Sequence, residues 1–195
     1  LELSSAASDV YKRQTYNQTM NFGQAVNSSL IKKYSTFKGR ACRAEWWYFL
    51  LFSFLVSLLV STVTVFFTFG SVDWEYVATL SEDNAATFIL NSDFGTSIKV
   101  VSIVLALALF LPGFAVTVRR LQDLDLSYYW SLPYLVASGI SIYITIAPSA
   151  VESMVRLDAF GNLIVIIYCL IFLRKGDYDD NRFGPSPLEL EEDTY

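Results

Sequence analysis

The chain contains no histidine among its 195 residues and has only two cysteines. Without imidazole it has no Ser-His-Asp or Cys-His couple, no histidine-ligated zinc or haem, and no histidine-based pH switch. The two thiols, Cys42 and Cys169, are too few for a cysteine-rich metal site, and we expect both to be unpaired packing or interface residues. We therefore expect no catalytic residue, no metal site and no cofactor.

Charged residues are also scarce, at 17% of the chain compared with about 25% in a typical soluble domain. Hydrophobic residues make up 53%, and the mean hydropathy is +0.40. Such a chain has too few polar residues to cover a soluble core, and it is too apolar and too aromatic to be disordered. The net charge of −5 gives no broad basic surface for nucleic acid. The composition predicts a membrane protein.

Four apolar runs are candidates to cross a hydrocarbon core about 30 Å thick, which requires a helix of about 20 residues. The first run has 27 consecutive uncharged residues and is apolar around its whole circumference, unlike a helix of a soluble bundle. The fourth run has only 15 uncharged residues, so its helix should begin nearer Glu152 or Met154. We predict an all-α membrane protein with four transmembrane helices, at about residues 46–69, 98–118, 129–147 and 153–173.

The segments outside these helices differ in character. Residues 1–14 resemble a translated adapter or cloning scar and are left out of the fold prediction. Residues 15–35 form a polar N-terminal segment, and the membrane domain is expected over residues 36–187. Within that domain an acidic outer loop is expected at residues 73–99, and residues 188–195 form an acidic C-terminal tail.

The positions of Lys and Arg predict the orientation, because cytoplasmic segments are enriched in these residues. Twelve of the 14 lie with the two termini or in the link between the second and third helices. The other side carries only Lys99 and Arg156. We therefore predict that both termini are cytoplasmic, and omitting Lys12 and Arg13 of the scar-like segment does not change this.

Three motifs adjoin the predicted helices: FKGRACRAEWWYF at residues 37–49, RRLQDLDLSYYW at 119–130, and GDYDDNRFGPSP at 176–187. Together with the four-helix layout, they resemble the bacterial inner-membrane family called domain of unknown function 805. The resemblance implies the fold and an inner-membrane location. It implies no mechanism, because the family has no established activity. Gln122 stands where the family usually has histidine, so a hydrogen-bonding role would survive there but an acid–base role would not.

We expect the polar residues of these motifs to converge on the cytoplasmic face. Arg40 and Arg43 would share a helix face if their segment is helical, and the charged residues from Arg119 to Asp125 are expected in the turn between the second and third helices. Asn181 and Arg182 follow the fourth helix. The candidate lipid- or partner-binding residues are Arg40, Arg43, Arg119, Arg120, Asp123, Asn181 and Arg182.

Two interpretations of this cluster remain open. The arginines either fix the topology by pairing with Glu45, Asp123 or lipid phosphate, or they form a site for an anionic headgroup or a protein partner. We expect a non-enzymatic structural or interaction component of the bacterial envelope, with the bilayer as its partner, anionic phospholipid as a candidate ligand, and no nucleic acid. Homo-oligomers and membrane-protein partners are both compatible with the sequence.

Two other functions are alternatives. A small carrier or channel subunit would have to act as an oligomer, because four helices without buried charge offer little polar lining. A lipid-modifying enzyme would have to use Asp123 or Asp125, and we consider it the weaker alternative.

Overall fold

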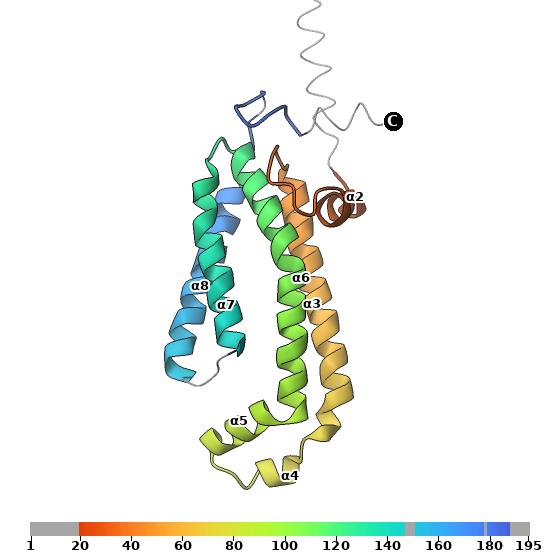
Figure 1. The fold of residues 1–195 in the computed structure, drawn as a ribbon, viewed down its shortest axis with the longest axis vertical. Helices are drawn as coiled ribbons and strands as arrows, with labels where there is room; N and C mark the ends of the chain where they lie inside the picture. Colours follow the sequence, from red (N-terminus) through yellow and green to blue (C-terminus); the bar gives the residue numbers. More distant parts are fainter. Residues whose placement is uncertain (1–19, 147–150, 178, 188–195) are drawn as a thin grey trace, which may run out of the picture. The chain divides into compact units, whose positions relative to one another are not determined.

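The computed structural model describes residues 20–146, 151–177 and 179–187, with only the backbone described for 151–158. The scar-like segment, the acidic tail and Pro148, where we expect the third helix to end, lie outside these residues. The described chain is helical, and its only β-pairing is an isolated bridge between Asn181 and Gly184. Its elements are α2 (Phe22–Asn27), η1 (Ser28–Lys32), α3 (Arg43–Thr68), η2 (Phe69–Ser71), α4 (Trp74–Val77), α5 (Glu82–Asn91), α6 (Asp93–Asp123), η3 (Tyr128–Ser131), α7 (Leu132–Ile146) and α8 (Val151–Phe172), as drawn in Figure 1.

Three helical stretches in the described residues are long and apolar enough to cross a membrane, and Ala159–Phe172 is a shorter apolar helix. The three are Arg43–Ser71, Asp93–Asp123 and Tyr128–Ile146. Large apolar side chains on them remain uncovered; Phe66 and Phe67 of α3 are 78% and 77% exposed. Exposed apolar surface of this extent is stable against lipid tails but not against water.

Hydroxyl groups within α3 are satisfied inside the helix itself. Thr62, Thr64 and Thr68 each donate a hydrogen bond to the carbonyl four residues earlier, at 2.8, 2.8 and 2.7 Å. A threonine that bonds its own helix leaves no polar group unpaired in hydrocarbon. These residues are therefore compatible with a membrane-spanning helix.

The chain divides into two compact units. We call residues 51–110 and 136–163 the central unit, and residues 1–50, 111–135 and 164–195 the terminal unit. Helices α3, α6, α7 and α8 contribute residues to both units, and each unit is described by itself below.

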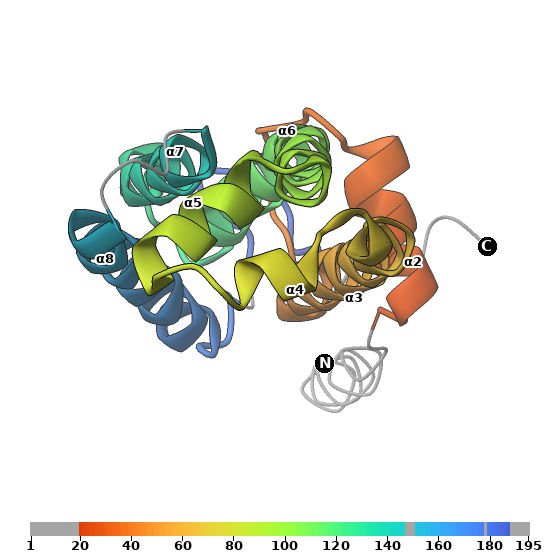
Figure 2. The same ribbon diagram turned by 90° about the horizontal axis from the view of Figure 1, so that it is seen from below.

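In the central unit, α4 and α5 lie between the end of α3 and the start of α6 (Figures 1 and 2). Aromatic rings connect them: Trp74 stacks on Phe69 with ring centroids 4.8 Å apart, and Tyr76 meets Phe88 edge-on at 5.2 Å. These helices occupy much of the region that the sequence predicted as a loop at residues 73–99. The prediction placed the start of the second long helix too late, because it followed the apolar run. The helix tolerates charge at its beginning, where Asp93 suits the helix dipole.

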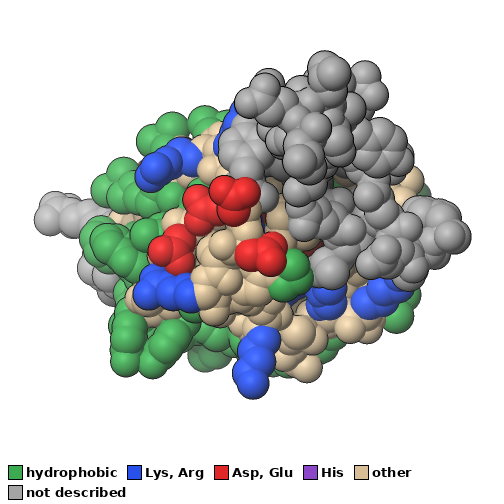
Figure 3. All heavy atoms as spheres, turned by 90° about the horizontal axis from the view of Figure 1, so that it is seen from above, with side chains coloured by type: hydrophobic (Ala, Val, Ile, Leu, Met, Phe, Trp, Pro, Cys, Tyr) green, Lys and Arg blue, Asp and Glu red, His purple; other side chains and the backbone are tan. Residues whose placement is uncertain are grey.

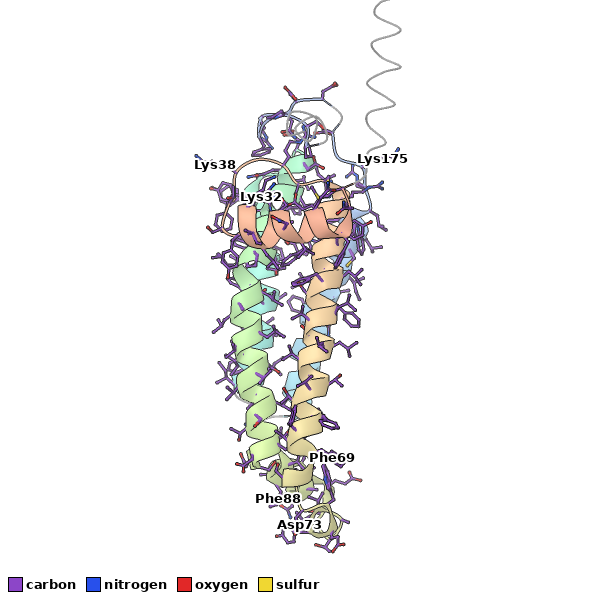
Figure 4. All side chains as sticks on the ribbon, turned by 90° about the vertical axis from the view of Figure 1, so that its right-hand side faces the viewer. Lys32, Lys38, Phe69, Asp73, Phe88 and Lys175 are labelled. Carbon is purple, nitrogen blue, oxygen red and sulfur yellow. The ribbon has the colours of Figure 1, made fainter. Side chains whose placement is uncertain are left out.

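The terminal unit has an apolar core beneath α2. Ala25 of α2 packs with Met20 and Cys42, and Tyr48 of α3 adds to this cluster. In the first turn of α3, the Trp46 ring contacts the Phe172 ring, with the ring centroids 4.8 Å apart. Figure 4 shows α2 running across the direction of α3, with Lys32, Lys38 and Lys175 near the level where α3 begins. The polar N-terminal segment of the sequence therefore contains a docked helix.

Candidate functional site

The terminal unit buries an unusual number of charged groups. Among its described residues, the charged side chains that are less than 5% exposed are Arg40, Glu45, Arg119, Arg120 and Asp123. A buried charge is costly unless it is paired and hydrogen-bonded. Their partners therefore determine what this part of the protein can do.

Asp123, the last residue of α6, is shared between two arginines. Arg40 Nε donates to Asp123 Oδ1 at 2.9 Å, and Arg120 Nη1 donates to the other carboxylate oxygen, Oδ2. Arg120 and Asp123 are three residues apart on the same helix, whereas Arg40 lies just before α3. The carboxylate therefore connects the beginning of one long helix to the end of another.

Other donors of these arginines bind backbone carbonyls at the end of α8 and in the segment that follows it, whereas Arg120 Nε is buried and has no hydrogen-bond partner among the described residues. Arg40 Nη1 donates to Asp179 O at 2.7 Å, and Arg40 Nη2 donates to Asp177 O. Arg120 Nη2 donates to Phe172 O at 3.3 Å and to Arg174 O. The last carbonyls of a helix have no partner within the helix, so Arg120 caps α8 with a positive charge where the helix dipole favours one.

Two glycines permit this arrangement. Gly39 has a φ of +93°, in the left-handed region, and it turns the chain directly before Arg40. Gly176 lies so close to Asp123 that a Cβ atom there would collide with the carboxylate. Asp177 N donates to Asp123 O at 3.0 Å, which holds the two segments together through the backbone as well.

Asn181 fixes the end of the same segment. Its Nδ2 donates to Gln122 O at 2.8 Å, and its Oδ1 accepts a hydrogen bond from Phe183 N at 2.9 Å. The Asn181 and Gly184 backbones pair across the turn. The amide therefore both shapes the turn and attaches it to α6. We use the name arginine clamp for Arg40, Arg120, Asp123 and Asn181 together with the backbone carbonyls of Phe172, Arg174, Asp177, Asp179 and Gly184.

A second buried ion pair makes its hydrogen bonds to residues outside the arginine clamp. Arg119 Nη1 donates to Glu45 Oε1 at 2.7 Å. Ser28 Oγ and Ser29 Oγ donate to the same oxygen at 3.0 and 3.3 Å. Glu45 thereby joins η1, α3 and α6. Arg119 Nε and Nη2 are buried and have no hydrogen-bond partner among the described residues.

The other two candidate arginines lie at the surface. Arg43 donates to Leu173 O at 3.2 Å. Arg182 pairs with Asp125 at 2.9 Å, with both side chains more than half exposed, and its guanidinium lies 4.8 Å from the Phe183 ring centroid. The exposed pair of Arg182 contributes little to stability. Both guanidinium groups are accessible to external anions because both side chains are exposed.

The structure thus brings Arg40, Arg120, Asp123 and Asn181 together, pairs Arg119 elsewhere, and leaves two arginines outside. The condition for a helix face shared by Arg40 and Arg43 is not met, because the helix begins only at Arg43; Arg40 is buried and Arg43 is exposed. One local expectation is wrong. The residues from Arg119 to Asp123 belong to α6 rather than to the turn, because their buried partners let the helix continue past the apolar run.

Sequence reasoning missed the two serines and the backbone carbonyls. Ser28 and Ser29 sit in a polar segment where nothing in the composition distinguishes them from solvated residues. Backbone carbonyls carry no sequence signal. Glu45 had a signal, since it stands two residues from Arg43 at the start of an apolar run and was expected as an arginine partner.

The chemistry available at this site is ionic pairing and hydrogen bonding. In the part of the chain that the structure describes, no group of three or more His, Cys, Asp or Glu residues could hold a metal ion. On the face in Figure 3, acidic side chains gather in one group with Lys and Arg side chains around it. The exposed acidic residues of the terminal unit include Asp125, Asp177, Asp179 and Asp180.

Comparisons with known proteins agree with the membrane fold. The family model described as "Protein of unknown function (DUF805)" matches residues 34–185. The inner membrane protein YhaH of Escherichia coli K12 is 28% identical over 164 residues, covering 81% of this chain and 92% of that protein. The inner membrane protein YhaI of the same strain is 24% identical over 159 residues, covering 82% and 92%. No solved structure matches the chain.

Proposed function

We propose that this chain, which belongs to the DUF805 family, is a four-span inner-membrane protein with both termini in the cytoplasm and a non-enzymatic structural or interaction role in the bacterial envelope. The observation that carries the proposal is the arginine clamp. Its charged groups are buried and bonded to the protein itself, which suits a group that holds the fold rather than one that meets a substrate.

The fourth span rests on the length of α8. The helix has 22 residues, which corresponds to about 33 Å at the usual helical rise. Its apolar part, Ala159–Phe172, is shorter than a typical span. Charged residues at the ends of a short span reach the headgroups along their flexible stems, and the bilayer thins locally around it. An even number of spans places both termini on one side, in agreement with the distribution of Lys and Arg.

Contact with anionic lipid or a protein partner is assigned to the exposed arginines. Arg43 and Arg182 present guanidinium groups at the surface of the terminal unit. A guanidinium forms two parallel hydrogen bonds with a phosphate or carboxylate, which an ammonium cannot reproduce. Arg40 and Arg120 have the same chemistry but are already bonded inside the fold.

Paired lysine variants test this division. We expect R40K and R120K to lower the melting temperature in detergent, because each lost charge-assisted contact costs roughly 1 to 3 kcal/mol. We expect R43K and R182K to keep the melting temperature and to reduce co-purification of anionic phospholipid.

One result would contradict this division between buried and exposed arginines. If R40K and R120K melt like the parent chain and lose the stabilisation given by added phosphatidylglycerol, the arginine clamp is a lipid site and not an internal connection.

A further inference from the structure

We propose that η1 and the residues after it form an interfacial anchor that lies on the cytoplasmic leaflet and binds anionic phospholipid. The anchor comprises Ile31, Lys32, Lys33, Tyr34 and Lys38. The assignment to the cytoplasmic leaflet rests on the topology proposed above; contact with the bilayer surface does not.

Apolar and aromatic side chains of the anchor are exposed. Ile31 is 75% exposed, close to the 78% of Phe66 on the membrane-spanning helix α3. Tyr34 is 38% exposed. An isoleucine with so much exposed surface at the end of a docked helix is unfavourable in water but favourable at the boundary between headgroups and acyl chains.

The opposite face of the segment is fixed to the protein. Ala25 is buried against Cys42, and the hydroxyls of Ser28 and Ser29 bind Glu45. These contacts leave the segment one orientation, in which Ile31 and Lys32 point away from the protein. The same contacts hold α2 across the direction of α3 (Figure 4). A helix that lies across a membrane span runs along the membrane surface.

The charged residues of this segment are all basic. Lys32, Lys33 and Lys38 are the charged residues between Met20 and Gly39, and no Asp or Glu occurs from residue 10 to residue 44. A basic stretch without acidic residues, directly before a membrane span, is attracted to a leaflet that carries anionic lipid. Tyrosine beside it is typical of the interface.

The experiment uses the full chain in nanodiscs, with C42A and C169A removing the native thiols. A fluorophore sensitive to polarity is attached at I31C, and a control fluorophore at D179C in the exposed acidic segment. The discs contain either phosphatidylcholine alone or a mixture with phosphatidylglycerol, each with a nitroxide-labelled lipid as quencher.

We expect blue-shifted emission and strong quenching at position 31, more with phosphatidylglycerol, and neither effect at position 179. K32Q/K33Q should abolish the increment that phosphatidylglycerol gives. If position 31 behaves like position 179 in both lipids, the segment is not an anchor. If quenching is the same in both lipids, the anionic preference is wrong. Nanodiscs expose both faces, so a reversed topology would not alter these readouts, and a failure of the anchor is distinguishable from a failure of the proposed topology.

Discussion

Asp123 is the residue on which the terminal unit depends most. It is 3% exposed, and its negative charge balances two buried guanidinium groups. One belongs to Arg40, before α3, and the other to Arg120, on the same helix as Asp123. Removing one partner of a buried ion pair leaves an uncompensated charge, which costs more than the pair contributes. Here the removal would leave two such charges.

We therefore expect D123N to lower the free energy of unfolding by about 3 to 5 kcal/mol. The matched control is D125N, two residues later, because Asp125 pairs with Arg182 at the surface and its loss should cost at most about 1 kcal/mol. Thermal melting of both variants in one detergent measures the difference. Equal melting temperatures would show that Asp123 does not balance buried charge.

At the scale of residues, the sequence indicated the side chains of the arginine clamp more readily than their partners. Arg40, Arg120, Asp123 and Asn181 were identifiable because they flank apolar runs within motifs. The backbone acceptors of Arg40 and Arg120 could not be predicted, because every residue has a carbonyl and only the path of the chain selects among them. The separation of Arg119 from Arg120 had no sequence signal either.

Among the elements, α2 and η1 show how a polar segment can still dock. The Asn21 side chain accepts a hydrogen bond from Gln24 N, and the Gln24 side chain accepts one from Asn21 N, so the helix starts with a capping box. Only Ala25 and two serines face the protein closely, which is too few apolar residues to produce a recognisable pattern. The sequence accordingly predicted a polar segment without a helix.

We expect S28A/S29A to release this element without unfolding the rest. Each lost hydroxyl contact costs about 0.5 to 1.5 kcal/mol, so the two losses together raise the population of the open segment roughly 5- to 160-fold. Trypsin should then cleave faster after Lys32 and Lys33, while the melting temperature stays near that of the parent chain.

The control is T62A/T64A, which removes two hydroxyls that bond only to their own helix. It should leave cleavage at these lysines unchanged. Parent-like cleavage of S28A/S29A would contradict the role given to the two serines.

The long helices were predictable as elements, but the two ends of α6 were not. The apolar runs marked the positions of α3 and α6, since hydrophobicity is what a membrane selects. α6 nevertheless extends beyond its run at both ends, from Asp93 to Asp123. Hydrogen bonding and internal ion pairs permit helix where hydropathy alone predicts a turn.

For the whole molecule, the proposed topology makes a direct prediction. In a C42A/C169A background, S81C should react with a membrane-impermeant maleimide in intact cells. K38C and D179C should react only after permeabilisation, because both termini are proposed to be cytoplasmic.

Other labelling patterns have defined meanings. Labelling of K38C and D179C but not S81C would reverse the orientation. Labelling of S81C and D179C without K38C would mean an odd number of spans, and α8 would then not cross.

The arginine clamp also sets an order of events during translation. Arg40 is synthesised 83 residues before Asp123 and 144 residues before Gly184, the last residue whose carbonyl it binds. At about 5 to 20 residues per second, the ribosome needs roughly 7 to 30 seconds to supply that last acceptor. Throughout this interval the guanidinium must stay hydrated or at the headgroups. The clamp therefore closes only after the segment that follows α8 has been made, and its closure distinguishes a chain that has passed this point from an earlier nascent one.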